Sequence, residues 1–235
     1  MRKLLDGAPA TAVIALLCVG VFVVAAFDAR SLIDVIWTSH LGQTFVLYGP
    51  LLVDTPFGYL RALTSGFLHV DISHLVVNLL VLVFIGPVVE RFVGTGPYIA
   101  AYVASILGGS AAVLLFGFAQ PTAGASGALY GLMAILVVIA ARNRADLRAP
   151  LVLVGGNLVF TLLVPGVSLW GHLGGMVTGA VMAAPLTAPG TRTRWAGAAA
   201  GLVLASGAVA LALTPSVSPV LALPAAAAPA PTPWM

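Results

Sequence analysis

Two polar residues stand inside long apolar stretches of this chain: Ser126, in the sequence GASG, and His172, in the sequence WGHLGG. Each opens an apolar run long enough to cross most of a bilayer, where a polar group is costly unless it has a partner or a use. A serine hydroxyl and an imidazole are the nucleophile and the general base of serine hydrolases. Their types and positions therefore predict hydrolytic chemistry at membrane depth.

The composition places the whole chain in a membrane. Of its 235 residues, 60% are hydrophobic and 7% are charged, whereas soluble globular proteins carry about 25% charged residues. The mean hydropathy is +1.10. The ten Lys and Arg residues form no basic stripe, so the net charge of +3 does not indicate nucleic acid as a partner. We expect a polytopic membrane protein of the all-α class.

Apolar windows predict seven spanning helices, each bounded by charge, Pro or Gly. The predicted spans are 10–27, 74–90, 97–118, 126–141, 149–164, 169–187 and 196–213. The long segment 28–73 mixes apolar and polar residues, and we expect short amphipathic pieces in it that lie at the membrane interface. The spans define a transmembrane domain over residues 1–213, and the Pro- and Ala-rich tail 214–235 is expected to be disordered.

The positions of Lys and Arg predict how the helices are oriented. If the N-terminus is cytoplasmic, inner segments hold eight of the ten positive residues: Arg2, Lys3, Arg91, Arg142, Arg144, Arg148, Arg192 and Arg194. Outer segments hold Arg30 and Arg61, so the positive-inside rule is satisfied. In this topology the second, fourth and sixth helices all begin at the outer face. Those starts carry His74, Ser126 and His172, which brings three polar residues to one side of the membrane.

Small residues predict that the fourth and sixth helices touch. Glycines at four-residue spacing form faces that let backbones approach closely in lipid. These glycines are Gly127 and Gly131 on the fourth helix and Gly171, Gly175 and Gly179 on the sixth. Tyr130, four residues after Ser126, lies over the same face and is expected to pack against the His172 ring. Ser126 and His172 are then within reach of each other.

The second helix supplies candidate donors for an oxyanion. His74 and Asn78 are four residues apart and therefore share a helix face. Their imidazole and carboxamide N–H groups can donate hydrogen bonds, as can the backbone N–H of Ser126. The fourth and sixth predicted helices contain no acidic residue, so His172 has no evident carboxylate partner. The sequence therefore predicts a Ser-His dyad rather than a triad with an Asp.

Taken together, these motifs resemble the rhomboid family of intramembrane serine proteases. The family pattern appears as Arg61 in the first loop, His74 with Asn78, Gly124 to Gly127 around Ser126, and His172 followed by Gly175. The sequences FLH at 67–69 and ERFVG at 90–94 are also similar to rhomboid sequence. The resemblance runs from about residue 55 to 187 and implies a rhomboid-like six-helix bundle there, plus one extra C-terminal transmembrane helix.

The resemblance also implies roles for single residues. Ser126 is the expected nucleophile, and His172 is the expected general base and then acid. His74, Asn78 and the amide of Ser126 are expected to form the oxyanion hole. Arg61 is expected to anchor the first loop, with Gly124, Gly127 and Tyr130 as supporting residues. Helix five, near 149–164, is expected to flank the substrate gate.

The implied partners are the lipid bilayer and transmembrane proteins, which family members cleave in or near their membrane segments, without metal or cofactor, after a small residue. We expect a multi-pass protein of the inner (plasma) membrane whose active site opens to the outer face. The oligomeric state is not readable from the sequence.

Three other functions compete with proteolysis. The first is that of a catalytically inactive rhomboid-like protein, which binds or escorts membrane proteins and typically lacks the serine or the histidine. The second is a metal hydrolase that uses His69, His74 and His172, although the chain has no HExxH motif. The third is a transporter, which is disfavoured because the chain shows no half-chain duplication or pair of broken helices.

Overall fold

A computed structural model describes residues 5–54 and 58–214, and within these ranges the chain forms helices and no β-strand. Seven long helices lie where the apolar windows predict them: α2 (Pro9–Ala29), α7 (Ile72–Val93), α8 (Thr95–Phe116), α9 (Ser126–Arg142), α10 (Arg148–Leu163), α11 (Leu169–Leu186) and α12 (Thr191–Ala212). The predicted and observed ends differ by at most five residues. The all-helical fold class is confirmed. The predicted disordered tail lies, from residue 215 on, outside the described residues.

The exterior of the bundle is apolar, as a membrane requires. In the described part of the chain, α2, α7, α8 and α12 are each long and apolar enough to cross a bilayer. The helices α9, α10 and α11 are shorter, with 17, 16 and 18 residues. Large apolar side chains point outward, among them Leu16, Phe27 and Leu163, which are 71%, 81% and 75% exposed. Lipid can cover such a surface at no hydrophobic cost.

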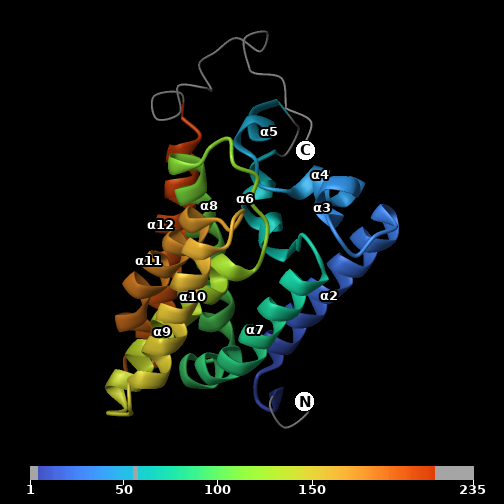
Figure 1. Ribbon diagram of the computed structural model, residues 1–235. Helices are drawn as coiled ribbons and strands as arrows, with labels where there is room; N and C mark the ends of the chain where they lie inside the picture. The colour runs from blue at the N-terminus through green and yellow to red at the C-terminus, as the bar shows by residue number, and fades with distance from the viewer. Residues whose placement is uncertain (1–4, 55–57, 215–235) are drawn as a thin grey trace.

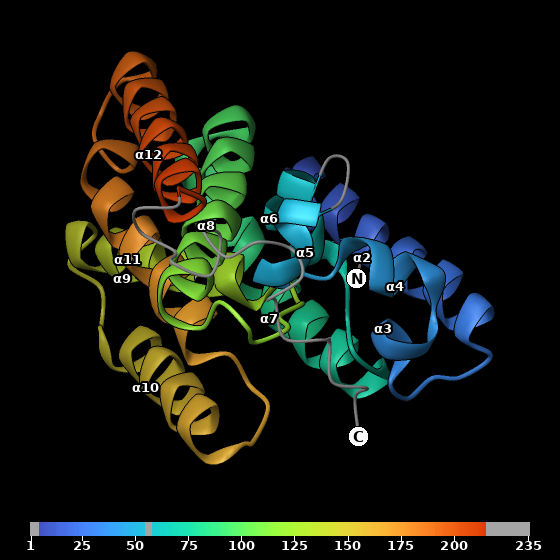
Figure 2. The same cartoon turned by 90° about the horizontal axis from the view of Figure 1, so that it is seen from above.

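The long helices form one bundle, with α9, α11 and α12 on one side, α2 on the other, and α8 and α7 between them (Figures 1 and 2). On one side α11 packs against α8 and α9, while α12 covers α8 and α11. On the other side α2 packs against α7, which contacts α9. The helix α10 lies at the edge of the bundle and packs mainly on α9 (Figure 2). The largest apolar core runs through the interior, from Ile14 on α2 to Ala205 on α12.

The first loop folds into short helices, as the mixed composition of 28–73 predicts. They are α3 (Val35–Thr38), α4 (His40–Phe45), α5 (Gly49–Asp54) and α6 (Arg61–Thr64), with 3-10 turns at Gly58–Leu60 and Ser65–Phe67. All of them lie at the end of the bundle where α7 begins (Figure 1). The segment 117–125 starts at this same end of the bundle and descends to the first turn of α9 (Figure 1). The short α9 therefore begins inside the molecule.

Side-chain caps fix where the long helices α7 and α11 start. The Asp71 carboxylate accepts a hydrogen bond from the backbone N–H of His74 at 2.8 Å and so caps α7. The Ser168 hydroxyl accepts one from the backbone N–H of Gly171 at 3.2 Å and caps α11. Burial alone would raise the pKa of Asp71, but hydrogen bonds from Ser73 and His74 outweigh it and the pKa lies below its usual value. Each cap places a histidine, His74 or His172, in the first turn of its helix.

Candidate active site

The site depends on a backbone contact between α9 and α11. A Cβ on Gly175 would stand 2.0 Å from the carbonyl oxygen of Gly127, and one on Gly179 would stand 2.2 Å from that of Gly131. Such distances exclude any side chain, because real Cβ atoms essentially never come within 3.0 Å of another heavy atom. The predicted glycine faces therefore meet, and they bring the two helices together at closest approach.

Ser126 and His172 meet next to this contact, toward the starts of α9 and α11. The distance between Ser126 Oγ and His172 Nε2 is 2.7 Å, which is that of a good hydrogen bond. Ser126 is the first residue of α9 and His172 lies in the first turn of α11. His172 is 6% exposed, so its ring is held by protein on nearly every side. The geometry is that of a hydroxyl next to a base.

The other edge and the face of the His172 ring are also occupied. Its Nδ1 lies 2.7 Å from the hydroxyl of Thr161 on α10. Tyr130 stacks on the ring with a centroid separation of 4.3 Å and an angle of 18°, as the sequence predicts, and its own hydroxyl lies 2.7 Å from that of Thr161. The imidazole is therefore fixed by three helices, α9, α10 and α11.

The sequence interpretation missed Thr161. The signal that could have indicated it is a pair of polar residues, Asn157 and Thr161, four apart within the apolar run of α10. Intramembrane polar residues usually face the interior of a bundle. Thr161 does so and is 4% exposed.

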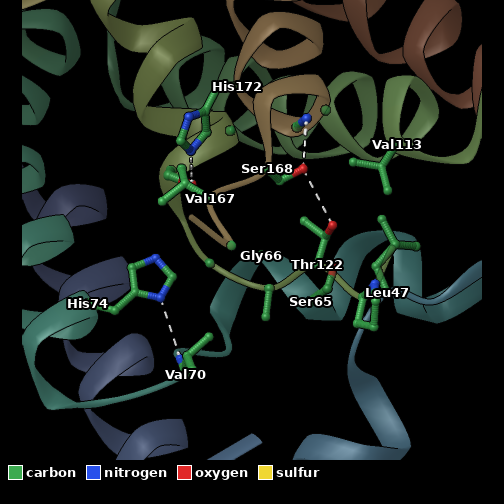
Figure 3. A pocket seen from close by; sticks show the side chains of 18 of the residues that line it. Leu47, Ser65, Gly66, Val70, His74, Val113, Thr122, Val167, Ser168 and His172 are labelled. Carbon is green, nitrogen blue, oxygen red and sulfur yellow. Dashed lines mark hydrogen bonds between the residues drawn. The ribbon is translucent and has the colours of Figure 1, made fainter. Parts of the chain in front are cut away.

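His74 faces the same cavity from α7. It lines the cavity together with Ser126 and His172, and Figure 3 shows the two rings on this common pocket. The point at which Gly124 would carry a Cβ lies 2.8 Å from His74 Nε2 and 3.6 Å from Ser126 Oγ, so both groups flank this glycine. The backbone N–H of Val70 points to His74 Nδ1 at 3.5 Å (Figure 3). The other ring nitrogen, Nε2, lies beside Gly124 and can carry a hydrogen toward the cavity.

Gly124 must be glycine for two reasons. Its φ is +129°, which L side chains rarely adopt, and any Cβ would clash with the His74 ring. The backbone N–H of Gly124 donates to the carbonyl of Ser65 at 3.0 Å, and Leu47 and Thr122 exchange two backbone hydrogen bonds. The first loop thereby holds the segment that leads into Ser126.

Asn78 is placed differently from the other candidate on α7. It is buried, and its carboxamide donates to the carbonyl of His74 at 3.0 Å, one turn earlier on the same helix. The residues that line the cavity in the described part of the chain include His74 but not Asn78. Because one amide hydrogen is already engaged with the backbone, a role toward an oxyanion would rest on the second amide hydrogen alone.

Arg61 is buried within the first loop and is not among the described residues that line the cavity. It is 6% exposed, and its guanidinium donates to the carbonyls of Gln43 at 2.8 Å and Val46 at 3.0 Å. These bonds join α6 to the end of α4. This is the geometry of an anchor, because the guanidinium is engaged by backbone carbonyls of the loop.

The cavity itself has a volume of about 420 Å³. Its walls come from the first loop, α7, α8, α9, the segment 117–125, the end of α10 and the start of α11. Apolar side chains such as Val77, Ile106 and Phe160 form much of the lining, and His74, Ser126 and His172 are among its polar residues. Within residues 5–54 and 58–214 no three His, Cys, Asp or Glu side chains are grouped so as to hold a metal ion. A largely apolar pocket that includes a few polar groups is the usual form of a binding or catalytic site.

Known proteins share this sequence pattern. A family profile described as the Rhomboid domain matches residues 56–189. The Rhomboid protease GluP of Bacillus subtilis is 37% identical over 134 residues, which cover 55% of this chain and 26% of that protein. The Rhomboid-type serine protease 2 of Emericella nidulans is 32% identical over 135 residues, with 53% and 26% covered.

A third relative comes from a plant. RHOMBOID-like protein 2 of Arabidopsis thaliana is 36% identical over 126 residues, which cover 51% of this chain and 39% of that protein. The chain thus spans between about a quarter and two fifths of the length of these relatives. The Rhomboid profile, in contrast, matches more than half of the 235 residues and contains all the candidate site residues from Arg61 to His172. This multi-pass helical membrane protein therefore belongs to the rhomboid family.

Proposed function

We propose that this chain is an intramembrane serine endopeptidase that cleaves other membrane proteins in or near their transmembrane segments. The observation that carries the proposal is the 2.7 Å contact between Ser126 Oγ and His172 Nε2 in the lining of a largely apolar cavity. A polar pair at membrane depth is expensive unless it is used. Two of the relatives, those of Bacillus subtilis and Emericella nidulans, are named as proteases, which supports the same function.

In the proposed reaction the Ser126 oxygen attacks the carbonyl carbon of the scissile bond while its proton passes to His172 Nε2. The carbonyl oxygen becomes an oxyanion, for which the backbone N–H of Ser126 and His74 Nε2–H are the proposed donors, with Asn78 as a further candidate. The same proton then passes to the leaving amine as the C–N bond breaks. A water molecule releases the acyl group from Ser126 by the reverse roles.

The proposal includes an orientation. The helices α7, α9 and α11 all run away from the end of the bundle that carries the first loop, and α2 starts at the opposite end (Figure 1). With the positive-inside distribution of Lys and Arg, we infer that the site opens to the outer face of the plasma membrane and that the start of α2 faces the cytoplasm. The substrates are then transmembrane proteins whose cleavage sites lie near the outer surface.

The test is cleavage of a reporter transmembrane substrate by the purified chain. We expect wild type to cleave it and Ser126→Ala and His172→Ala to lose cleavage while they keep their melting temperature. EDTA should leave the wild-type rate unchanged. Full cleavage by Ser126→Ala would refute the serine mechanism, and inhibition by EDTA that zinc reverses would favour a metal enzyme. A folded wild type that never cleaves would favour the non-catalytic function.

A further inference from the structure

The proposed general base, His172, has a hydrogen-bond partner at Nδ1, the ring nitrogen that points away from Ser126. The inference drawn from this partner rests on the proposed function. Thr161 lies 2.7 Å from His172 Nδ1, 2.7 Å from the Tyr130 hydroxyl and 2.9 Å from the carbonyl of Asn157. It is the only side chain of α10 that is buried. The neighbouring glycines Gly155 and Gly156 face open space, because a Cβ added to either would have no atom within 4 Å.

The proton inventory of these contacts decides which group donates. A threonine hydroxyl has one proton and two lone pairs. The Asn157 carbonyl can only accept, so the Thr161 proton lies on that bond, the usual bond of a threonine to the carbonyl four residues back in a helix. The two other contacts of Thr161 must then be hydrogen bonds that it accepts. Tyr130 O–H donates one of them and His172 Nδ1–H donates the other.

This assignment fixes the tautomer of the neutral His172 ring. With its hydrogen on Nδ1, the ring presents a free lone pair at Nε2, where the Ser126 hydroxyl lies at 2.7 Å. The opposite tautomer would point an N–H at Ser126 and could not take its proton. A carboxylate holds the same tautomer in Ser-His-Asp sites. Here a neutral hydroxyl occupies the equivalent position.

We propose that Thr161 is a positioning residue that holds His172 in the Nδ1–H tautomer and so keeps Nε2 free to accept the Ser126 proton. When that proton arrives, the ring becomes an imidazolium whose Nδ1–H still donates to Thr161. The proton on Nε2 then leaves with the amine product, and the ring returns to the same tautomer. The helix α10 packs mainly on α9 and buries no side chain other than Thr161. The tautomer of His172 therefore depends on the position of this one helix.

The first test reads the tautomer without any turnover. The chain is labelled with 15N-histidine, and His172, one of four histidines, is assigned by comparison with His172→Ala. At a pH where the ring is neutral, we expect the wild-type spectrum to show a protonated Nδ1 and an unprotonated Nε2, and Thr161→Val to shift His172 toward the other tautomer or a mixture. A wild-type ring protonated at Nε2 would overturn the proposal, whether or not the valine variant folds.

The second test is kinetic. Thr161→Val keeps the side-chain shape and should lower kcat by about 10- to 100-fold, the range expected when a hydrogen bond to a developing charge is lost, with little change in KM. Thr161→Ser keeps the hydroxyl and should recover most of the rate. The control is Thr187→Val at the far end of α11, because Thr187 is also 4% exposed and also bonds the carbonyl four residues back.

The outcomes separate the two proposals. Equal kcat values for Thr161→Val and Thr187→Val, or no recovery by Thr161→Ser, would refute the role of Thr161 while leaving the serine mechanism intact. Full cleavage by Ser126→Ala would instead refute the mechanism, and the 15N spectrum would still decide the tautomer.

Discussion

The contact between α9 and α11 predicts a graded loss of activity when methyl groups are added to glycines. A Cβ on Gly175 would stand 2.0 Å from the Gly127 carbonyl oxygen, whereas ordinary contact begins at 3.4 Å. The difference, about 1.4 Å, must come from separation of the two backbones, since neither atom belongs to a flexible side chain. A Cβ on Gly127 would stand 3.1 Å from the Gly171 carbonyl oxygen, a shortfall of about 0.3 Å.

These separations of the two backbones occur next to Ser126 and His172. Gly127 follows Ser126 directly, and Gly175 is one turn from His172, so a separation of about 1.4 Å would stretch the 2.7 Å hydrogen bond beyond bonding distance. Misplacement of catalytic groups by about 1 Å can cost on the order of 100-fold in rate. We expect Gly175→Ala to lose about 100-fold or more in kcat/KM and Gly127→Ala to lose much less.

The assay is cleavage of the reporter substrate together with a thermal melt for each variant. Gly20→Ala on α2 and Gly207→Ala on α12 are the matched controls, because each lies within a helix and has no atom within 4 Å of the added methyl group. They should keep full activity, and Ala in place of Gly within a helix can stabilise it by about 0.5–1 kcal/mol. If Gly175→Ala matched the controls in rate and melting temperature, the close approach of α9 and α11 would be wrong.

Two further predictions concern α7. His74→Ala should lower kcat by about 100- to 1000-fold, as the loss of an oxyanion donor does. Asn78→Ala should lower kcat by less than about tenfold, because the Asn78 carboxamide already bonds its own helix. Equal losses of kcat in steady-state kinetics would contradict this assignment of the oxyanion donors. The folded pKa of Asp71 lies below its unfolded value, so its stabilising effect is complete above the unfolded pKa of about 4 and is lost as the pH falls through the folded pKa. The melting temperature of wild type should therefore fall more than that of Asp71→Asn between about pH 6 and pH 3, and parallel curves would contradict this assignment.

The sequence was sufficient to predict features that depend on residues close together in the chain. The helix ends follow from apolar runs bounded by charge, Pro or Gly, and the contact of α9 with α11 follows from glycines at four-residue spacing. The stacking of Tyr130 on His172 follows from the position of Tyr130 one turn after Ser126. Each of these needs only a helical period and the knowledge that two helices touch.

Contacts that depend on the position of a third helix could not be predicted from the sequence in this way. Thr161 is eleven residues from His172, across a loop, and a threonine in an apolar helix ordinarily does no more than bond its own backbone. Thr161 does form that bond to Asn157, and the contact with His172 depends on where α10 lies beside α11. The direction of the Asn78 carboxamide is equally invisible, because a shared helix face does not fix which partner a flexible amide selects.

The energetics of the site explain why so few polar residues are sufficient in an apolar bundle. An unpartnered polar group is costly to bury, and a hydrogen bond gains strength where the surroundings are of low dielectric. Ser126, His172, Thr161 and Tyr130 form one connected chain of hydrogen bonds and ring contacts, drawn from α9, α10 and α11. The chain ends on the backbone carbonyl of Asn157, which needs no further partner. Each member therefore satisfies its neighbour, and the same network that offsets the cost of burial also directs the free lone pair of His172 at Ser126.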